Sequence, residues 1–187
     1  MSSLYLLIGG NQGDRKALLQ QATDLIRQRV GSVVGCSQLY ETAPWGTFDQ
    51  KDTQPFLNMA LHVETSLSAH DCLLECLAIE KELGRQRKGN ALPSDTKRVY
   101  SSRPIDIDLI LFDDEVISSP DLTIPHPRMH QRRFVLQPLC DIAPDTVHPV
   151  LKKTISQLLS ICEDNCSCSV YCSALECCWR NTPSAAP

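Results

Sequence analysis

The stretch Arg103-Pro104-Ile105-Asp106-Ile107-Asp108-Leu109-Ile110-Leu111-Phe112 decides the fold of this chain. Its run of Ile and Leu, followed by the turn residues Asp113-Asp114, predicts a buried strand. Because strand side chains alternate between faces, Asp106 and Asp108 share one face, with Cα atoms about 6.5 Å apart. Two carboxylates this close on an apolar strand repel each other and resist the loss of water. A divalent cation such as Mg²⁺ removes both penalties, and it usually completes its coordination with water and substrate phosphates.

The Asp-x-Asp motif is short, and it leaves open an edge strand whose aspartates simply face water. Neighbouring charges favour a ligand site. The segment from Arg85 to Arg103 contains six Arg and Lys residues against one acidic residue, Asp95, although the whole chain carries a net charge of −4. Basic residues gathered near an aspartate pair indicate a small polyanionic ligand, whereas nucleic acid usually requires a more basic domain.

Length and composition predict one well-packed domain, which we place over residues 1–150. The chain has 187 residues, of which 42% are hydrophobic, and this is enough for one well-packed core. No apolar run is long enough to cross a bilayer, and the N-terminus lacks the basic start of a signal peptide. We therefore expect a cytoplasmic protein with no membrane partner.

Residues 151–187 are expected to form a cysteine-rich C-terminal extension of unknown role. Six of the ten cysteines of the chain lie there, without a Cys-x-x-Cys pair or a common zinc spacing. A metal or redox role for these thiols stays open. The pattern favours an incidental, weakly packed segment, with one short helix over 153–162 followed by irregular chain.

Hydrophobic periodicity predicts the order strand, helix, strand, strand, helix, strand. The expected strands are Leu4–Ile8, Val33–Glu41, Phe56–Thr65 and the aspartate strand, and the expected helices are Arg15–Val30 and Ser68–Leu83. This order is typical of an α+β, ferredoxin-like α/β sandwich with an antiparallel sheet.

Two long loops interrupt this pattern, and further elements follow it. The loops, Thr42–Pro55 and Arg85–Ser102, have a length that is usually functional or disordered in a compact domain. After Phe112 we expect a short strand over 115–118, an extended segment over 120–127, and a helix that begins near Met129 and stops before Pro138.

Separated motifs over residues 4–150 occur in the order and spacing of one enzyme family. They are Ile8-Gly9-Gly10-Asn11, Tyr40-Glu41-Thr42-Ala43-Pro44, Phe56-Leu57-Asn58, Ile79-Glu80 through Gly84-Arg85, the aspartate strand, Pro125-His126-Pro127 and Arg132-Arg133-Phe134. Together they resemble the 6-hydroxymethyl-7,8-dihydropterin pyrophosphokinase family. The resemblance implies transfer of pyrophosphate from ATP to 6-hydroxymethyl-7,8-dihydropterin, giving the pterin diphosphate and AMP in folate biosynthesis.

The resemblance also implies roles for individual residues. Two Mg²⁺ ions are expected on Asp106 and Asp108, and these two residues, Arg87 and Arg103 are expected to be catalytic. The implied ATP site consists of Glu80, Arg87, Tyr100, Arg103, His126 and Arg132. Arginine suits this role because its guanidinium group donates two parallel hydrogen bonds to phosphate oxygens. Two alternatives stay open: Arg103 forms an ion pair with Asp106 or Asp108, and Glu80 is a solvated helix residue.

The implied pterin site combines aromatic side chains with a strand amide. Its members are Thr42, Pro44, Trp45, Phe56, Asn58 and Phe134. Aromatic rings suit a flat heterocycle, and an amide both donates to and accepts from its edge. Without the resemblance, an ordinary hydrophobic core is the favoured interpretation of both phenylalanines.

Two other functions remain possible at this stage. A metal-dependent phosphohydrolase could use the same aspartates with water as the nucleophile, but it would need no site for a flat organic acceptor. A non-catalytic binding or assembly module could work through the cysteine-rich extension. The favoured interpretation is a monomeric enzyme whose partners are ATP and the pterin, with other folate-pathway enzymes as possible associates.

Overall fold

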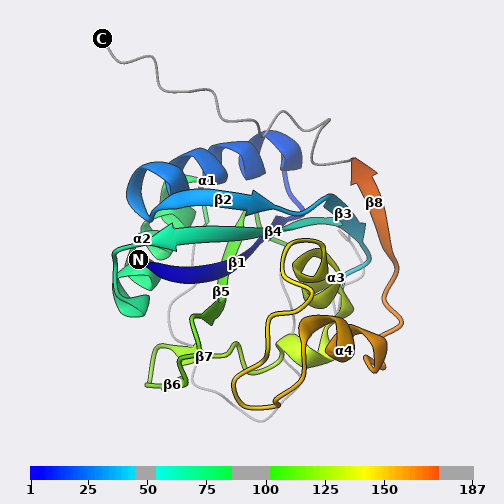
Figure 1. The fold of residues 1–187 in the computed structure, drawn as a ribbon. Helices are drawn as coiled ribbons and strands as arrows, with labels where there is room; N and C mark the ends of the chain where they lie inside the picture. The colour runs from blue at the N-terminus through cyan, green and yellow to red at the C-terminus, as the bar shows by residue number, and fades with distance from the viewer. Residues whose placement is uncertain (45–53, 86–101, 173–187) are drawn as a thin grey trace.

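One antiparallel sheet organises the protein, with helices on both of its faces (Figure 1). The computed structural model describes residues 1–44, 54–85 and 102–172. The strand order is β5-β1-β4-β3-β8, and β2 pairs with β4 as well. The strands are β1 (Ser2–Gly10), β2 (Ser32–Cys36), β3 (Leu39–Thr42), β4 (Phe56–Thr65), β5 (Asp106–Phe112) and β8 (Cys168–Cys172). Because β1 lies between β4 and β5, and α1 and α2 connect the strands, the expected ferredoxin-like α+β fold is confirmed.

The face of the sheet under α1 (Arg15–Arg29) and α2 (Ala69–Glu82) is apolar. Leu6, Met59 and Ile107, from three adjacent strands, belong to this core cluster and are almost completely buried. The side chains of Asp14 and Ser68 cap the two helices by accepting from the backbone N–H groups of Ala17 and Asp71. This face and the two helices therefore form the larger hydrophobic core of the protein.

The opposite face of the sheet carries α3 (Arg133–Ile142) and α4 (Ile155–Ser160) over a second, smaller core cluster. Leu7 belongs to this second cluster and is paired directly with Asp108 across the β1–β5 ladder. Since directly paired residues share a face, Asp106 and Asp108 lie on the α3 side. The sheet therefore separates the core under α1 and α2 from the candidate site on the α3 side.

Two expected elements differ from the observed ones. The strand expected over Val33–Glu41 is divided into β2 and β3, because the hydroxyl of Ser37 accepts the hydrogen bond of the Ala60 backbone N–H at 2.9 Å. The helix expected to stop before Pro138 instead continues through it to Ile142, so that prediction was wrong. Pro138 removes one backbone hydrogen bond, but it is itself buried and lies between the buried side chains of Leu136 and Leu139, which pack in the second core.

The remaining described elements are short. After β5 come β6 (Ile117–Ser118), β7 (Thr123–Ile124) and a 3-10 turn, η1 (Met129–Gln131). Within residues 151–172, α4 lies against α3 and β8 pairs with β3, so part of the segment expected to be irregular is a strand of the main sheet. The boundary at residue 150 stays a prediction.

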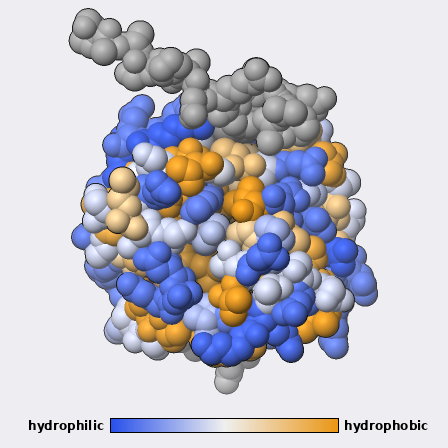
Figure 2. Space-filling view, viewed as in Figure 1, coloured by the Kyte–Doolittle hydropathy of each residue, from blue (hydrophilic) through white to orange (hydrophobic). Residues whose placement is uncertain are grey.

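Figure 2 shows hydrophilic and hydrophobic residues interspersed over the face seen in Figure 1. Among residues 1–44, 54–85 and 102–172, no helix has both the length and the apolar character that a bilayer span requires.

Candidate active site

The carboxylate of Asp106 is held by two arginines. Its Oδ1 accepts from Arg85, and its Oδ2 accepts from Nη1 of Arg103 at 2.5 Å. Arg85 reaches this position because it directly follows the C-terminal turn of α2, while Arg103 lies three residues before Asp106. The ion-pair alternative for Arg103 is therefore present in this structure.

Glu80 connects α2 to the start of β5. Its side chain is 1% exposed, which excludes the solvated alternative, and its Oε1 accepts from the backbone N–H of Ile107 at 2.8 Å. The same oxygen accepts from Arg85. Glu80 thus fixes the strand that carries both aspartates and holds one arginine beside them.

Asp108 is the less compensated of the two carboxylates. Burial raises the pKa of Asp108 to about 7, and the charge of Asp106 adds to this shift, while Arg132 and Arg103 oppose it. Among the described residues, no group of three or more His, Cys, Asp or Glu side chains could hold a metal ion. Asp106 and Asp108, two carboxylates on one face of β5, would suit an ion such as Mg²⁺, which takes a carboxylate or two from the protein and its other ligands from water and phosphates.

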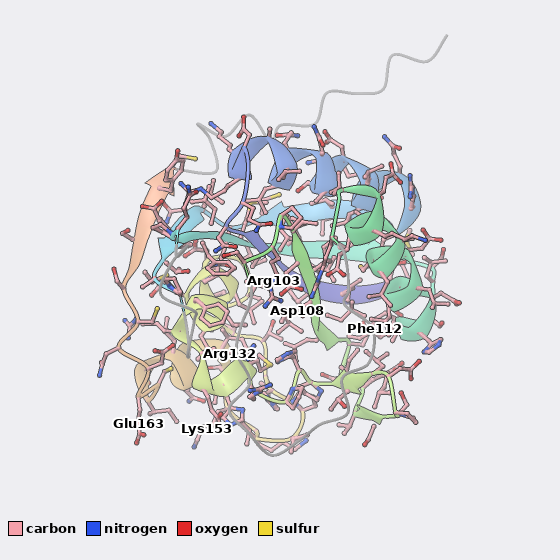
Figure 3. All side chains as sticks on the ribbon, turned by 180° about the vertical axis from the view of Figure 1, so that it is seen from behind. Arg103, Asp108, Phe112, Arg132, Lys153 and Glu163 are labelled. Atoms are coloured by element: carbon pink, nitrogen blue, oxygen red, sulfur yellow. The ribbon has the colours of Figure 1, made fainter. Side chains whose placement is uncertain are left out.

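His126 and Arg132 bring donors to the same region from the chain after β7. The backbone N–H of His126 donates to Ile110 on β5 at 3.0 Å, and Nδ1 of His126 accepts from the Arg128 backbone N–H at 3.3 Å. Burial, together with the charges of Arg132 and Arg128, lowers the pKa of His126 to about 4. The imidazole is therefore neutral near pH 7, and Nε2 is the ring nitrogen left to donate. Figure 3 shows Arg132, at the start of α3, below Arg103 and Asp108.

The expected pterin side chains Asn58 and Thr42 are joined directly. Nδ2 of Asn58 donates to Oγ1 of Thr42 at 2.7 Å, and the two residues are 5% and 2% exposed. This bond fixes the amide orientation, so that the acceptor oxygen of Asn58 faces β1. A buried amide with a set orientation can recognise the edge of a heterocycle.

Gly9 lies between the amide of Asn58 and the carboxylate of Asp106. It is paired with Asn58 on β4 and with Asp106 on β5, so all three residues share one face of the sheet. A Cβ atom at Gly9 would lie 2.2 Å from Oδ1 of Asn58. The missing side chain therefore leaves the room that the Asn58 amide oxygen occupies next to Gly9.

Two aromatic side chains complete the expected acceptor region. Phe56 is half-buried and is paired with Thr42 across the β3–β4 ladder. Phe134 is half-buried in the first turn of α3, where the Arg132 guanidinium lies 5.5 Å from its ring centroid. Pro44 is partly buried two residues after Thr42. Trp45, Arg87 and Tyr100 lie outside the described residues.

The chain matches a known protein family over most of its length. The family model described as 7,8-dihydro-6-hydroxymethylpterin-pyrophosphokinase (HPPK) matches residues 5–144. The chain belongs to the HPPK family.

Two relatives named 2-amino-4-hydroxy-6-hydroxymethyldihydropteridine pyrophosphokinase illustrate the similarity. The chain is 43% identical over 150 residues to the protein of Porphyromonas gingivalis, covering 80% of this chain and 95% of that protein. It is 33% identical over 157 residues to the protein of Aquifex aeolicus, covering 84% of this chain and 90% of that protein.

The solved structures that resemble this chain support the fold. Wild-type Plasmodium falciparum HPPK-DHPS crystallised with pteroate matches with a TM-score of 0.66 at 17% identity. The match covers 85% of this chain and 44% of that one, so the chain corresponds to less than half of that longer protein.

Two residues of this HPPK-family chain have contacts for which the sequence predicted no role. Arg85 bridges Glu80 and Asp106, and the basic run that begins with it was the available signal. Asn11 is 2% exposed and accepts from the backbone N–H of Arg103 at 2.8 Å through Oδ1. Its Nδ2 donates to the hydroxyl of Ser102 and to the carbonyl of Gln54. Asn11 therefore connects the end of β1 to the segment that leads into β4 and to the segment that leads into the aspartate strand. In the sequence, the position of Asn11 in the Ile8-Gly9-Gly10-Asn11 motif was the only indication of this role.

Proposed function

We propose that this protein transfers the β,γ-diphosphoryl group of ATP to the hydroxymethyl group of 6-hydroxymethyl-7,8-dihydropterin and releases AMP. The observation that carries the proposal is the pairing of Gly9 with Asn58 on one side and Asp106 on the other. An acceptor held at the amide would reach the phosphates held at the carboxylates over a residue without a side chain. Membership of the HPPK family and the names of its relatives support the same reaction.

The acceptor half of the proposed site is uncharged. Asn58, oriented by Thr42, would bind the edge of the pterin, and the rings of Phe56 and Phe134 would stack on its faces. We assign Pro44 and Trp45 to the same region, with Trp45 outside the described residues. This arrangement would present the hydroxymethyl oxygen toward β5.

The nucleotide half of the proposed site is charged. Arg103, Arg132 and neutral His126 would donate to the phosphate oxygens of ATP, and we add Arg85 because it already lies at Asp106. Glu80 would act by fixing β5 and orienting Arg85. Arg87 and Tyr100 remain assigned to ATP as predictions, since they lie outside the described residues.

Magnesium would be held by Asp106 and Asp108, and we expect two ions. When bound, the metal supplies charge neutralisation on the phosphate oxygens during transfer. Both oxygens of Asp106 accept hydrogen bonds from arginines in the structure. We propose that Arg85 and Arg103 turn from this carboxylate to the phosphates when ATP arrives with its metal.

The chemical step follows from this arrangement of groups. The hydroxymethyl oxygen attacks the β-phosphorus, the bond from that phosphorus to the α,β-bridging oxygen breaks, AMP leaves, and the hydroxyl proton is released. No described side chain is assigned as a dedicated base. Positioning of the two substrates and compensation of phosphate charge would provide most of the rate enhancement.

We further propose a monomeric, cytoplasmic enzyme that takes ATP and the pterin as its small-molecule partners. Association with other folate-pathway enzymes stays a possibility within this proposal. It requires no nucleic acid and no membrane, in keeping with the acidic net charge of −4.

The test is to mix the protein with Mg²⁺, ATP and 6-hydroxymethyl-7,8-dihydropterin and to separate the nucleotides. The proposal expects AMP that forms only when both the pterin and Mg²⁺ are present. Release of ADP, or AMP that forms equally without the pterin, would contradict it and favour an ordinary kinase or a phosphohydrolase.

A further inference from the structure

A segment near the C-terminus contacts the acceptor half of the site from one edge of the sheet. We call residues 163–172 the C-terminal strap. The family match ends at residue 144, so the strap lies beyond the part of the chain that the family model describes. Figure 1 shows β8, the last strand of the strap, beside β3 at the sheet edge away from β5. The strap makes three separate contacts there.

The first contact supports the strand that carries Thr42. β3 has only four residues, and β8 pairs with it on the edge opposite β4, with Thr42 paired to Cys168. Beyond the end of β3, the thiol of Cys166 lies 3.5 Å from the carbonyl oxygen of Ala43. Without the strap, β3 would be a four-residue edge strand, and such a strand is weakly held because one side of its backbone pairs with nothing.

The second contact caps the helix that carries Phe134. The backbone N–H of Arg133 donates to Oδ2 of Asp164 at 2.8 Å, and the other oxygen of Asp164 accepts from the Cys166 backbone N–H. The N-cap residue of α3 is Arg132, whose side chain makes no capping hydrogen bond. A carboxylate at this end also opposes the positive end of the helix dipole. The strap therefore provides the cap that α3 does not provide for itself.

The third contact supports the chain just before Phe56. The ring of Tyr171 lies 5.8 Å from the guanidinium carbon of Arg15. Nη1 of Arg15 in turn donates to the carbonyl oxygen of Pro55 at 2.7 Å and to Glu41 on β3 at 2.9 Å. Tyr171 covers the arginine that connects β3 to the start of β4.

We propose that the C-terminal strap positions the pterin half of the site, with Asp164 and Tyr171 as its positioning residues. The three contacts converge on the backbone that bears Thr42, Phe56 and Phe134, and none of them involves the aspartates of β5. The inference rests on the proposed function, because it assigns the pterin to these three residues. It predicts that damage to the strap weakens use of the pterin and leaves the nucleotide half nearly unchanged.

The test uses full-length variants and steady-state kinetics in both substrates. Asp164→Ala should raise KM for the pterin about fivefold, as expected for a lost helix cap. Tyr171→Ala should raise it about twofold, as expected for an exposed ring–cation contact. KM for ATP and kcat should each stay within about twofold of wild type, because Arg132 shares the phosphates with other donors.

Matched variants separate positioning from general damage. Glu163→Ala and Val170→Ala change the exposed neighbours of the two positioning residues and should leave both KM values unchanged. Asp164→Asn keeps one acceptor oxygen for the Arg133 N–H, so it should recover most of the pterin KM.

Two results would contradict the positioning role of the strap. One is an unchanged pterin KM in both Asp164→Ala and Tyr171→Ala; the other is an equal rise in both KM values, which indicates loosening of the whole fold. If the wild-type protein releases no pterin-dependent AMP, the proposed function is contradicted, and so is the positioning role of the strap that rests on it. If the wild-type protein is active and Asp164→Ala and Tyr171→Ala both keep its KM for the pterin, only the positioning role of the strap is contradicted.

Discussion

The two halves of the candidate site are built from different interactions. Around β5, the carboxylate of Asp106 is held by the charged groups of Arg85 and Arg103. Around β3 and β4, neutral Asn58 and Thr42 are joined by one hydrogen bond, and both are nearly completely buried. In the function that we propose, metal and phosphate replace the charged partners of Asp106, whereas Asn58 and Thr42 keep their hydrogen bond. The proposal therefore combines a nucleotide half that rearranges with an acceptor half that stays fixed.

The largest expected effect comes from Asp108→Asn, which removes charge from the nucleotide half. We expect kcat/KM to fall about a thousandfold or more, because a metal-holding carboxylate is lost. The metal-free variant should nevertheless be more stable than wild type above pH 7. Circular dichroism melts and denaturant titrations in a chelator would measure this.

The sign of the stability effect follows from the pKa of Asp108. Burial raises this pKa to about 7, against roughly 3.9 in an unfolded chain. Between these values the native state binds a proton that the unfolded state has released, so wild-type stability falls as pH rises through this window. Asparagine does not ionise, and the free energy of unfolding at pH 8 should rise by on the order of 1 kcal/mol. Asp114→Asn, at an exposed turn position, is the control, and equal stability changes in both variants would contradict the account.

Arg85→Ala should separate the two roles that we give to this arginine. We expect kcat to fall about a hundredfold, since a donor to the developing phosphate charge is lost. Binding of Mg²⁺ without nucleotide should instead become tighter, because a cation that competes for Asp106 is gone. Isothermal titration with MgCl₂ would measure the binding.

The control for Arg85 is Arg29→Ala, which breaks a surface ion pair with Glu82. It should change neither quantity. Weaker Mg²⁺ binding in Arg85→Ala would show that this arginine does not compete with the metal.

Gly9→Ala and Gly10→Ala should damage different halves of the site. A Cβ at Gly9 would meet the Asn58 side chain at 2.2 Å, and one at Gly10 would meet the Pro104 carbonyl at 2.1 Å. The first change should raise mainly KM for the pterin, and the second mainly KM for ATP, because Pro104 precedes the aspartate strand. Overpacking should also destabilise each variant by about 1–3 kcal/mol, so the kinetics belong at low temperature. Identical kinetic changes in the two variants would remove the distinction between the halves.

The smallest effect is expected for Thr42→Val, which keeps the shape but removes the hydroxyl that orients Asn58. KM for the pterin should rise about fivefold, in keeping with the loss of roughly 1 kcal/mol from one hydrogen bond. Thr65→Val makes the same chemical change at another buried threonine, whose hydroxyl donates to the Val30 carbonyl at 2.6 Å. It should lower the melting temperature without changing either KM. An unchanged pterin KM in Thr42→Val would contradict the claim that the Thr42 hydroxyl orients Asn58 for pterin binding.

Local periodicity predicts only part of the site. Alternation along one strand was enough to place Asp106 and Asp108 on the same face, whereas Asn58 was assigned through the family resemblance. The bridge from Arg85 to Asp106 depends on where the end of α2 lies relative to β5, which no local pattern records.

The same distinction explains the errors and omissions in the fold. Pro138 ends a helix by local rules, but burial of its neighbours Leu136 and Leu139 outweighs the lost hydrogen bond. Asp164 caps a helix that begins 31 residues earlier, so its role depends on tertiary structure alone. The sequence favoured an incidental extension because the contacts that its described residues make with β3 and α3 are of this long-range kind.

The most direct test of the central claim uses ATP labelled on its β-phosphorus, with wild-type protein, Mg²⁺ and 6-hydroxymethyl-7,8-dihydropterin. Separation of the products shows which molecule carries the label. Our account predicts label in the pterin product and unlabelled AMP, because the diphosphoryl group moves as a unit across Gly9. Label that stays in ADP, with only the γ-phosphate on the pterin, would contradict it.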